Sequence, residues 1–189
     1  DIADALRLAQ TIRLGAEAAG AGYIVTFGIA PTFPSTAYGY IQLGDVLPDS
    51  RTTGNSIVRF LEKPDLHLAQ TLLLQGGHLW NAGIFLVRAG TLIDALREHA
   101  PDILAACEAA TVGLSHDGRF IRLDKEGFER CPSDSIDYAV LEKHKRVAVI
   151  PFTGAWSDVG SWNAIANLYP ADSSGNRLTG KASALNSPA

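Results

Sequence analysis

The chain has 189 residues, of which 47% are hydrophobic and 19% are charged, and its formal net charge is −4. This composition is typical of one globular domain and excludes a disordered chain. Because it lacks a basic block and a long apolar run, we expect neither nucleic acid nor a membrane among its partners.

Helical and extended patterns alternate along the chain. Apolar residues recur with helical spacing over 2–19, and the run 23–27 is nearly all apolar, which is typical of a strand covered on both faces. Shorter extended pieces occupy 38–41 and 57–61. Further helices are expected at 66–75, 89–99, 101–110, 136–141 and 161–168, and further strands at 79–87 and 146–152.

This alternation predicts an α/β fold, a three-layer sandwich around a mixed, mainly parallel sheet. Sheets of this kind bind ligands at the carboxyl ends of their strands. Three polar motifs lie beside expected strands: Glu62-Lys-Pro64 follows one, Asn81 begins another, and Asp158 follows the last. We therefore expect these motifs to contribute to one ligand site.

The Glu62-Lys-Pro64 motif combines an acid, a base and a proline. The proline is expected to push Lys63 toward an extended conformation. The ammonium of Lys63 suits a phosphate, and the carboxylate of Glu62 can accept hydrogen bonds from sugar hydroxyls. Taken alone, the motif is better explained as an ordinary strand end, because short motifs recur by chance.

Two glycine-containing motifs are also ambiguous. Asn81 supplies a donor and an acceptor, which fits a vicinal diol, and Gly83 permits the close approach of a ligand. An asparagine in a turn before a strand explains this motif equally well. Gly39, between Tyr38 and Tyr40, leaves a gap for a ligand, although a bulge flanked by packed aromatic side chains is the preferred explanation for that motif alone.

Two aspartates complete the candidates. Asp158 lies on the glycine-flanked loop GAWSDVGSW, where its carboxylate suits Mg²⁺ and Trp156 can wall a pocket. A structural corner with packed tryptophans is the less favoured alternative. Asp137 is better explained as a first-turn aspartate that interacts with the helix dipole, and sugar or metal binding is its second interpretation.

The histidines and cysteines show no such pattern. No metal or triad spacing links His67, His78, His99, His116 and His144, so we expect surface or incidental roles for them. Cys107 and Cys131 are typical of free thiols in a reducing compartment, which predicts a cytoplasmic protein. The chain contains no methionine, even at position 1, and we therefore expect it to be a piece of a longer protein.

The motifs occur in an order that resembles a known family. YGYI at 38–41, FLEKPD at 60–65, WNAGIFL at 80–86, SIDYAVLEK at 135–143 and WSDVGSW at 156–162 together resemble the sugar-nucleotide pyrophosphorylases. The likeness runs from about 23 to 180. It is greatest to the mannose-1-phosphate guanylyltransferase branch, also called GDP-mannose pyrophosphorylase.

The resemblance implies a nucleotidyl transfer that depends on Mg²⁺ and uses GTP and mannose 1-phosphate as partners. By analogy, Lys63 holds the sugar phosphate, Glu62 and Asn81 bind mannose hydroxyls, and Asp158 binds Mg²⁺. The implied catalytic residues are Lys63 and Asp158, and the implied substrate-binding residues are Gly39, Glu62, Asn81, Gly83, Asp137 and Trp156.

The chain also departs from the family pattern. The family's glycine-rich G-x-G-x-R-L-x-P loop and its second metal-binding aspartate do not occur in this sequence. Residues 1–170 are therefore expected to form the carboxyl-terminal, sugar-binding part of a nucleotidyltransferase domain, with 171–189 as a tail or the start of another segment. Two alternatives stay open, a thymidylyl- or uridylyltransferase and a non-catalytic sugar-phosphate-binding fragment. A homo-oligomer is compatible with the sequence.

Overall fold

The structure is a computed structural model that describes residues 2, 4–48 and 53–185. The chain divides into two compact units. The larger unit is Leu6–Thr153, and the smaller unit combines Asp1–Ala5 with Gly154–Ala189.

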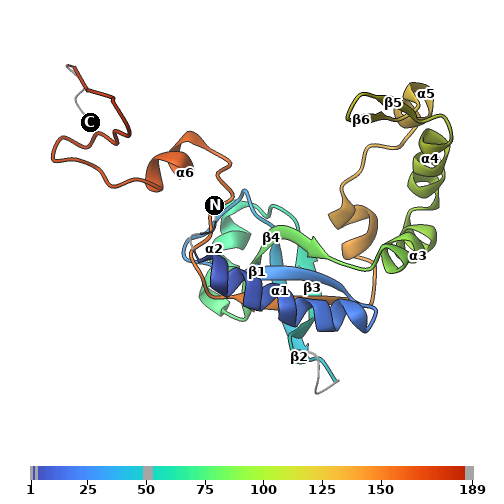
Figure 1. The fold of residues 1–189 in the computed structure, drawn as a ribbon. Coiled ribbons are helices and arrows are strands. Elements are labelled where there is room, and N and C mark those ends of the chain that lie inside the picture. The colour runs from blue at the N-terminus through green and yellow to red at the C-terminus, as the bar shows by residue number, and fades with distance from the viewer. Residues whose placement is uncertain (1, 3, 49–52, 186–189) are drawn as a thin grey trace. The chain divides into compact units, whose positions relative to one another are not determined.

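The larger unit contains both helices and strands, and its helix α1 begins one residue before it, at Ala5 (Figure 1). In chain order they are α1 Ala5–Gly20, β1 Ile24–Ile29, β2 Tyr40–Val46, β3 Asn55–Leu61, α2 Leu66–Gln75, β4 His78–Leu86, α3 Ala89–His99, α4 Pro101–Val112, β5 Ser115–Asp117, β6 Phe120–Arg122, α5 Lys125–Glu129, the π-helix η1 Asp137–Leu141 and β7 Val147–Phe152.

The main sheet is mixed, as expected, but it is not mainly parallel. Strand β1 pairs in parallel with β7 and antiparallel with β4, while β2 pairs antiparallel with both β3 and β4. A short antiparallel pairing of β3 with β7 closes the strand order β1-β4-β2-β3-β7 into a barrel. The connection 47–54 between β2 and β3 is too short for the crossover that parallel neighbours need, so these two strands pair antiparallel.

Helices cover both faces of β1 and β7, which confirms the three-layer arrangement around these strands. On one face, α1 contributes Ala18 and Ala19 to a cluster with Val25, Phe27, Ala148 and Ile150. On the other face, Ile24 and Val147 pack with Ala95 of α3 and Val140 of η1. Every residue of β1 is buried, as its apolar sequence predicts. Full burial of each Val, Ile or Phe side chain contributes about 1.5–3 kcal/mol.

Local sequence explains several element boundaries. Asp65 caps α2 by accepting a hydrogen bond from the Leu68 amide at 2.8 Å, and Pro101 occupies the first turn of α4. The expected helix at 136–141 forms instead as η1, in which the Glu142 amide donates to the carbonyl of Asp137 at 3.0 Å. This wider turn is rare and is frequent at functional sites.

The sequence analysis missed the elements between α4 and η1. The hairpin of β5 and β6 and the short helix α5 were not expected, because strands of three residues and a helix of five carry too little periodicity. No helix in the described residues is long and apolar enough to span a bilayer.

The smaller unit has little regular structure. Ile2 and Trp156 form an isolated antiparallel bridge. The helix α6, Trp162–Asn167, lies within the expected 161–168 and begins where the hydroxyl of Ser161 accepts a hydrogen bond from the Ala164 amide at 3.1 Å. The domain boundary expected at 170 stays a prediction, and residues 186–189 of the expected tail lie outside the described part.

Candidate functional site

The Glu62-Lys-Pro64 motif lies where β3 ends. The Nζ of Lys63 is 3.2 Å from Oε1 of Glu62, and the lysine side chain is 63% exposed while the glutamate side chain is 13% exposed. Lys63 has a φ of 45°, so the expectation of an extended Lys63 is wrong. The left-handed region costs a residue with a Cβ about 1–2 kcal/mol. Such strain concentrates at functional sites, and here it holds an ammonium group at the end of a strand.

Gly39 lies directly against Glu62. A Cβ at position 39 would lie 2.6 Å from Oε2 of Glu62 and 3.2 Å from the ring of Phe60. The gap that the sequence suggested for a ligand is therefore occupied by the Glu62 carboxylate. Gly39 lets that carboxylate approach the backbone, and its carbonyl also accepts a hydrogen bond from the Asn81 amide at 2.8 Å.

Asn81 on β4 is oriented by several hydrogen bonds. Its Oδ1 accepts from the hydroxyl of Thr26 at 2.7 Å and from the amide of Gly83 at 3.2 Å. Its Nδ2 donates to Oδ1 of Asp137 at 3.3 Å. The side-chain oxygen already has two donors, so the acceptor role expected toward a sugar is taken by the protein. The second hydrogen on Nδ2 of Asn81 is therefore the group that can donate to a ligand.

Gly83 has a backbone role beside Asn81. Its φ is 68°, and the pairing of β1 with β4 shifts register opposite it, between Thr26 and Gly28. Bulges of this kind redirect neighbouring side chains. The bulge brings the Gly83 amide to Oδ1 of Asn81, so Gly83 helps to orient Asn81.

Three carboxylates come together around η1. Burial and then the charge of Glu62 raise the pKa of Asp137, while a backbone hydrogen bond and Lys63 partly lower it. Burial, followed by the charges of Asp137 and Glu62, raises the pKa of Glu142. An acidic cluster of this kind repels a bare phosphate and attracts hydroxyl hydrogens or cations, so the cationic Lys63 is the suitable group for a phosphate.

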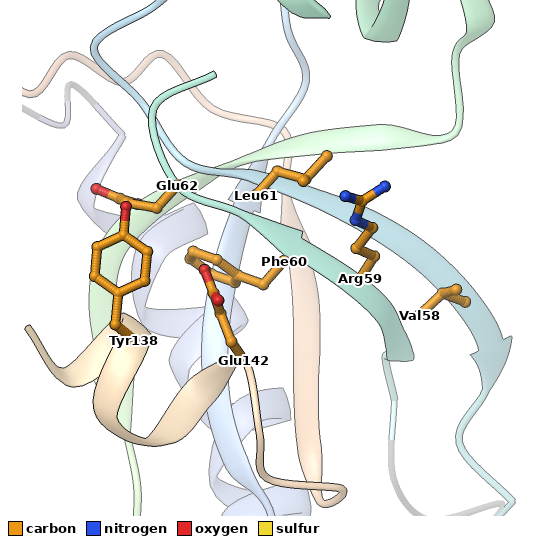
Figure 2. A pocket seen from close by; sticks show the side chains of 7 residues that line it. All are labelled: Val58, Arg59, Phe60, Leu61, Glu62, Tyr138 and Glu142. Carbon is orange, nitrogen blue, oxygen red and sulfur yellow. The ribbon is translucent and has the colours of Figure 1, made fainter. Parts of the chain in front are cut away.

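A cavity of about 420 Å³ adjoins this cluster. Figure 2 shows Tyr138 and Glu142 extending from η1 toward Phe60 and Glu62 at the end of β3. The cavity lining is Val58, Arg59, Phe60, Leu61, Glu62, Tyr138 and Glu142.

Sequence reasoning singled out one lining residue, Glu62, and missed others that its own motifs contained. Tyr138 and Glu142 are four residues apart within SIDYAVLEK, a spacing that places them on one face of a helical turn. Thr26 is a buried hydroxyl within the apolar strand β1 and holds Asn81. A polar residue inside an otherwise apolar strand was the available signal for Thr26.

The remaining predicted residues belong to the smaller unit. In this unit Val159 has a left-handed backbone, with a φ of 56°, and its amide donates to the hydroxyl of Ser157 at 3.2 Å. A Cβ at Gly160 would overlap the carboxylate of Asp158, so this glycine lets that carboxylate approach the backbone. The structure thus brings together Gly39, Glu62, Lys63, Asn81, Gly83 and Asp137, and the joining of Trp156 and Asp158 to them stays a prediction.

Known proteins are similar in sequence to most of this chain, and two of them illustrate the similarity. Mannose-1-phosphate guanylyltransferase ManC from Salmonella typhimurium is 46% identical over 159 residues, which cover 84% of this chain and 33% of that protein. The xanthan biosynthesis protein XanB from Xanthomonas campestris pv. campestris (strain B100) is 43% identical over 175 residues, or 93% of this chain and 36% of that protein. The chain therefore spans about a third of the length of these relatives.

A solved structure has the same fold. The structure described as a mannose-1-phosphate geranyltransferase from Thermus thermophilus has a TM-score of 0.79 and 31% sequence identity, with coverage of 96% of this chain and 50% of that one. These similarities confirm the resemblance that the ordered motifs indicated, and they confirm an α/β, nucleotidyltransferase-like fold. The sequence profile for nucleotidyl transferases matches residues 1–174. The chain belongs to the nucleotidyl transferase family.

Proposed function

We propose that the protein containing this chain is a mannose-1-phosphate guanylyltransferase. It joins GTP and mannose 1-phosphate into GDP-mannose and releases pyrophosphate. The observation that carries this proposal is the network of Glu62, Asn81 and Asp137 beside the exposed ammonium of Lys63. Hydrogen-bonding groups for sugar hydroxyls and a cation for a phosphate are what a sugar-phosphate site requires.

In this reaction an oxygen of the sugar phosphate attacks the α-phosphorus of GTP. The bond from that phosphorus to the bridging oxygen breaks, and the electron pair leaves with pyrophosphate. Such a transfer needs positioned reactants and neutralised charge rather than a covalent intermediate. Lys63 supplies positive charge to the sugar phosphate, while Glu62 and Asn81 fix the sugar by its hydroxyls, and Asp137 and Gly83 hold Asn81 in place.

Mg²⁺ is the proposed cofactor, and Asp158 is its proposed ligand. The donor chemistry fits, because Mg²⁺ prefers carboxylate oxygens, usually one or two from the protein, and fills its coordination sphere with water and phosphate oxygens. Gly160 lets the Asp158 carboxylate lie against the backbone of this loop, where a side chain at position 160 would displace it. When bound, the ion would neutralise phosphate charge, and Trp156 would shape the loop that carries its ligand.

The test is pyrophosphate release by the full-length protein with Mg²⁺ and GTP, with and without mannose 1-phosphate. Wild type should release pyrophosphate when both substrates are present. A hydrogen bond to a charged group contributes about 1.5–3 kcal/mol, so Lys63→Ala should lower kcat/KM by about 10- to 100-fold or more. Lys125→Ala is the matched control, since the Lys125 side chain is 84% exposed and lies 3.7 Å from Glu129 on the same helix.

Two results would contradict the proposal. Full activity of Lys63→Ala would remove the central role from the Glu62-Lys-Pro64 motif. Turnover of dTTP or UTP in preference to GTP, measured with a panel of sugar 1-phosphates, would assign the protein to a related transferase instead.

A further inference from the structure

We propose that Glu98, His99 and His144 form a binding site for one divalent transition-metal ion, with Zn²⁺ as the best-fitting candidate. The sequence analysis expected incidental roles for the histidines, because their spacing matches no known metal motif. The fold nevertheless brings two of them together, next to a carboxylate. One ligand atom from each of the three residues lies within 4.8 Å of the other two.

The three ligand atoms already have the spacing of a coordination site. Nε2 of His99 is 3.2 Å from Nδ1 of His144, and Oε2 of Glu98 is 3.7 Å from the first atom and 4.0 Å from the second. A point equidistant from all three atoms lies about 2.1 Å from each, which matches the usual Zn–N and Zn–O distances. An ion at this point lies in the plane of the three atoms, and a small approach of the exposed Glu98 carboxylate to the two nitrogens would let water complete a tetrahedral set.

The two imidazoles already share a hydrogen bond, because Nε2 of His99 lies 3.2 Å from Nδ1 of His144, and an ion would replace the hydrogen between these two atoms. Coordination at Nδ1 would place the remaining hydrogen of His144 on Nε2, a buried atom with no hydrogen-bond partner among the described residues, which is a cost that metal binding has to exceed. The carboxylate of Glu98 offsets part of the positive charge of the ion.

The ligand types separate this site from the one proposed for Mg²⁺. Two imidazole nitrogens and one carboxylate oxygen with an open position suit Zn²⁺ and similar transition ions, whereas Mg²⁺ prefers oxygen ligands throughout. Asp158, the proposed Mg²⁺ ligand, contributes none of the three donor atoms.

The position of the cluster gives the ion a structural consequence. Glu98 and His99 are the last two residues of α3, while His144 follows η1 and donates its backbone amide to the carbonyl of Val140 at 2.8 Å. Ala95 of α3 and Val140 already pack in one apolar cluster. A bound ion would join α3 to the turn that carries Asp137 and Tyr138, and it should therefore stabilise the folded protein.

The test uses full-length protein that has been stripped with a chelator and kept in excess Mg²⁺. Zn²⁺ is then titrated in competition with a chromophoric chelator, and its stoichiometry is measured by elemental mass spectrometry. We expect one high-affinity Zn²⁺ per chain and a rise in thermal midpoint on binding. His99→Gln and His144→Gln should each weaken Zn²⁺ binding by about 100-fold or more, since even the loss of an outer-shell partner costs about 10- to 100-fold.

Two further variants make the result specific. His116→Gln, which removes an exposed histidine of β5, should bind Zn²⁺ as wild type does. Glu98→Gln keeps the shape of an exposed side chain and should weaken binding without loss of the fold. Absence of stoichiometric Zn²⁺ in wild type, or a Zn²⁺ affinity in His99→Gln and His144→Gln equal to that of wild type, overturns the proposal. Loss of the ion in Asp158→Asn but not in the histidine variants also overturns it, because the ion would then occupy the other site.

Discussion

At its amino end, η1 presents Asp137 to Asn81 of β4, whereas just past its carboxyl end His144 meets two residues of α3. Burial disfavours the charged form of both groups. It raises the pKa of Asp137 and lowers the pKa of His144, so the fold favours the neutral form of each. The two sites differ in how their side chains are held.

Asp137 belongs to a network in which each partner has further partners. Asn81, which donates to Asp137, accepts from Thr26 and from the backbone of Gly83. The histidine cluster draws its three ligand atoms from the end of one helix and one following turn. A substitution in the network should therefore change both stability and activity, while a substitution in the cluster should change metal affinity and leave the transfer reaction intact.

The largest effect in the network is expected for Asn81→Asp. The new carboxylate can still accept from Thr26, but it replaces a donor to Asp137 with a like charge, at an atom pair now 3.3 Å apart. We expect a loss of about 1–3 kcal/mol in the free energy of unfolding at pH 7 and a drop of about 10- to 100-fold in kcat/KM for mannose 1-phosphate. Urea titration and the pyrophosphate assay measure the two effects.

The matched control is Asn163→Asp, an exposed asparagine in the first turn of α6. An added acid there interacts favourably with the helix dipole and should not destabilise the protein. The Asn81→Asp loss should also shrink as the pH falls, because a proton shared by the two carboxylates relieves their repulsion. Wild-type stability of Asn81→Asp at pH 7 would show that the network is no more sensitive than the histidine cluster.

Gly39→Ala should have a smaller and more selective effect. The new Cβ would lie 2.6 Å from the carboxylate end of Glu62, a flexible side chain that can swing away, and 3.2 Å from the Phe60 ring. Stability should fall by less than about 1 kcal/mol, whereas KM for mannose 1-phosphate should rise about tenfold through the displaced Glu62. Gly90→Ala is the control, because a Cβ there meets no atom within 4 Å. An unchanged KM in Gly39→Ala would exclude Glu62 as a sugar contact.

The elements that the sequence predicted best are those whose boundaries are set locally. The expected ranges of α2 and α3 are those observed, and at α2 the Asp65 side chain ends the preceding loop and caps the helix. The strand β1 was recognisable because its sequence is nearly all apolar, and all of its residues are indeed buried. In the same way, the motif at 62–64 was recognisable as the end of a strand, whereas Asn81, which was expected at the start of a strand, lies inside β4.

What the sequence did not predict depends on contacts between distant segments. The preference of a residue before proline describes an average, and at Lys63 the ion pair with Glu62 and the capped start of α2 accompany a left-handed backbone instead. The contact between His99 and His144 joins residues 45 apart, which no local spacing reveals. The sheet was expected to be mainly parallel because buried strands alternated with helices, a pattern that does not specify which strands become neighbours.

The smallest effect tests whether the buried charge of Asp137 destabilises the fold. Because its folded pKa is raised above the ordinary value of 3.8, the folded protein binds this proton more tightly than the unfolded chain does. Stability therefore falls as the pH rises from 3.8 through the raised value, and the cost persists above it. Asp137→Asn keeps an oxygen for the Asn81 amide without the charge, so it should match wild type at low pH and be slightly more stable at pH 7, while its activity falls about tenfold.

Asp94→Asn, which breaks an exposed ion pair with Arg97, is the control and should give no such gain in stability. A stability difference that does not grow between pH 4 and pH 7 in urea titrations would show that Asp137 is held in its charged form, unlike the neutral His144.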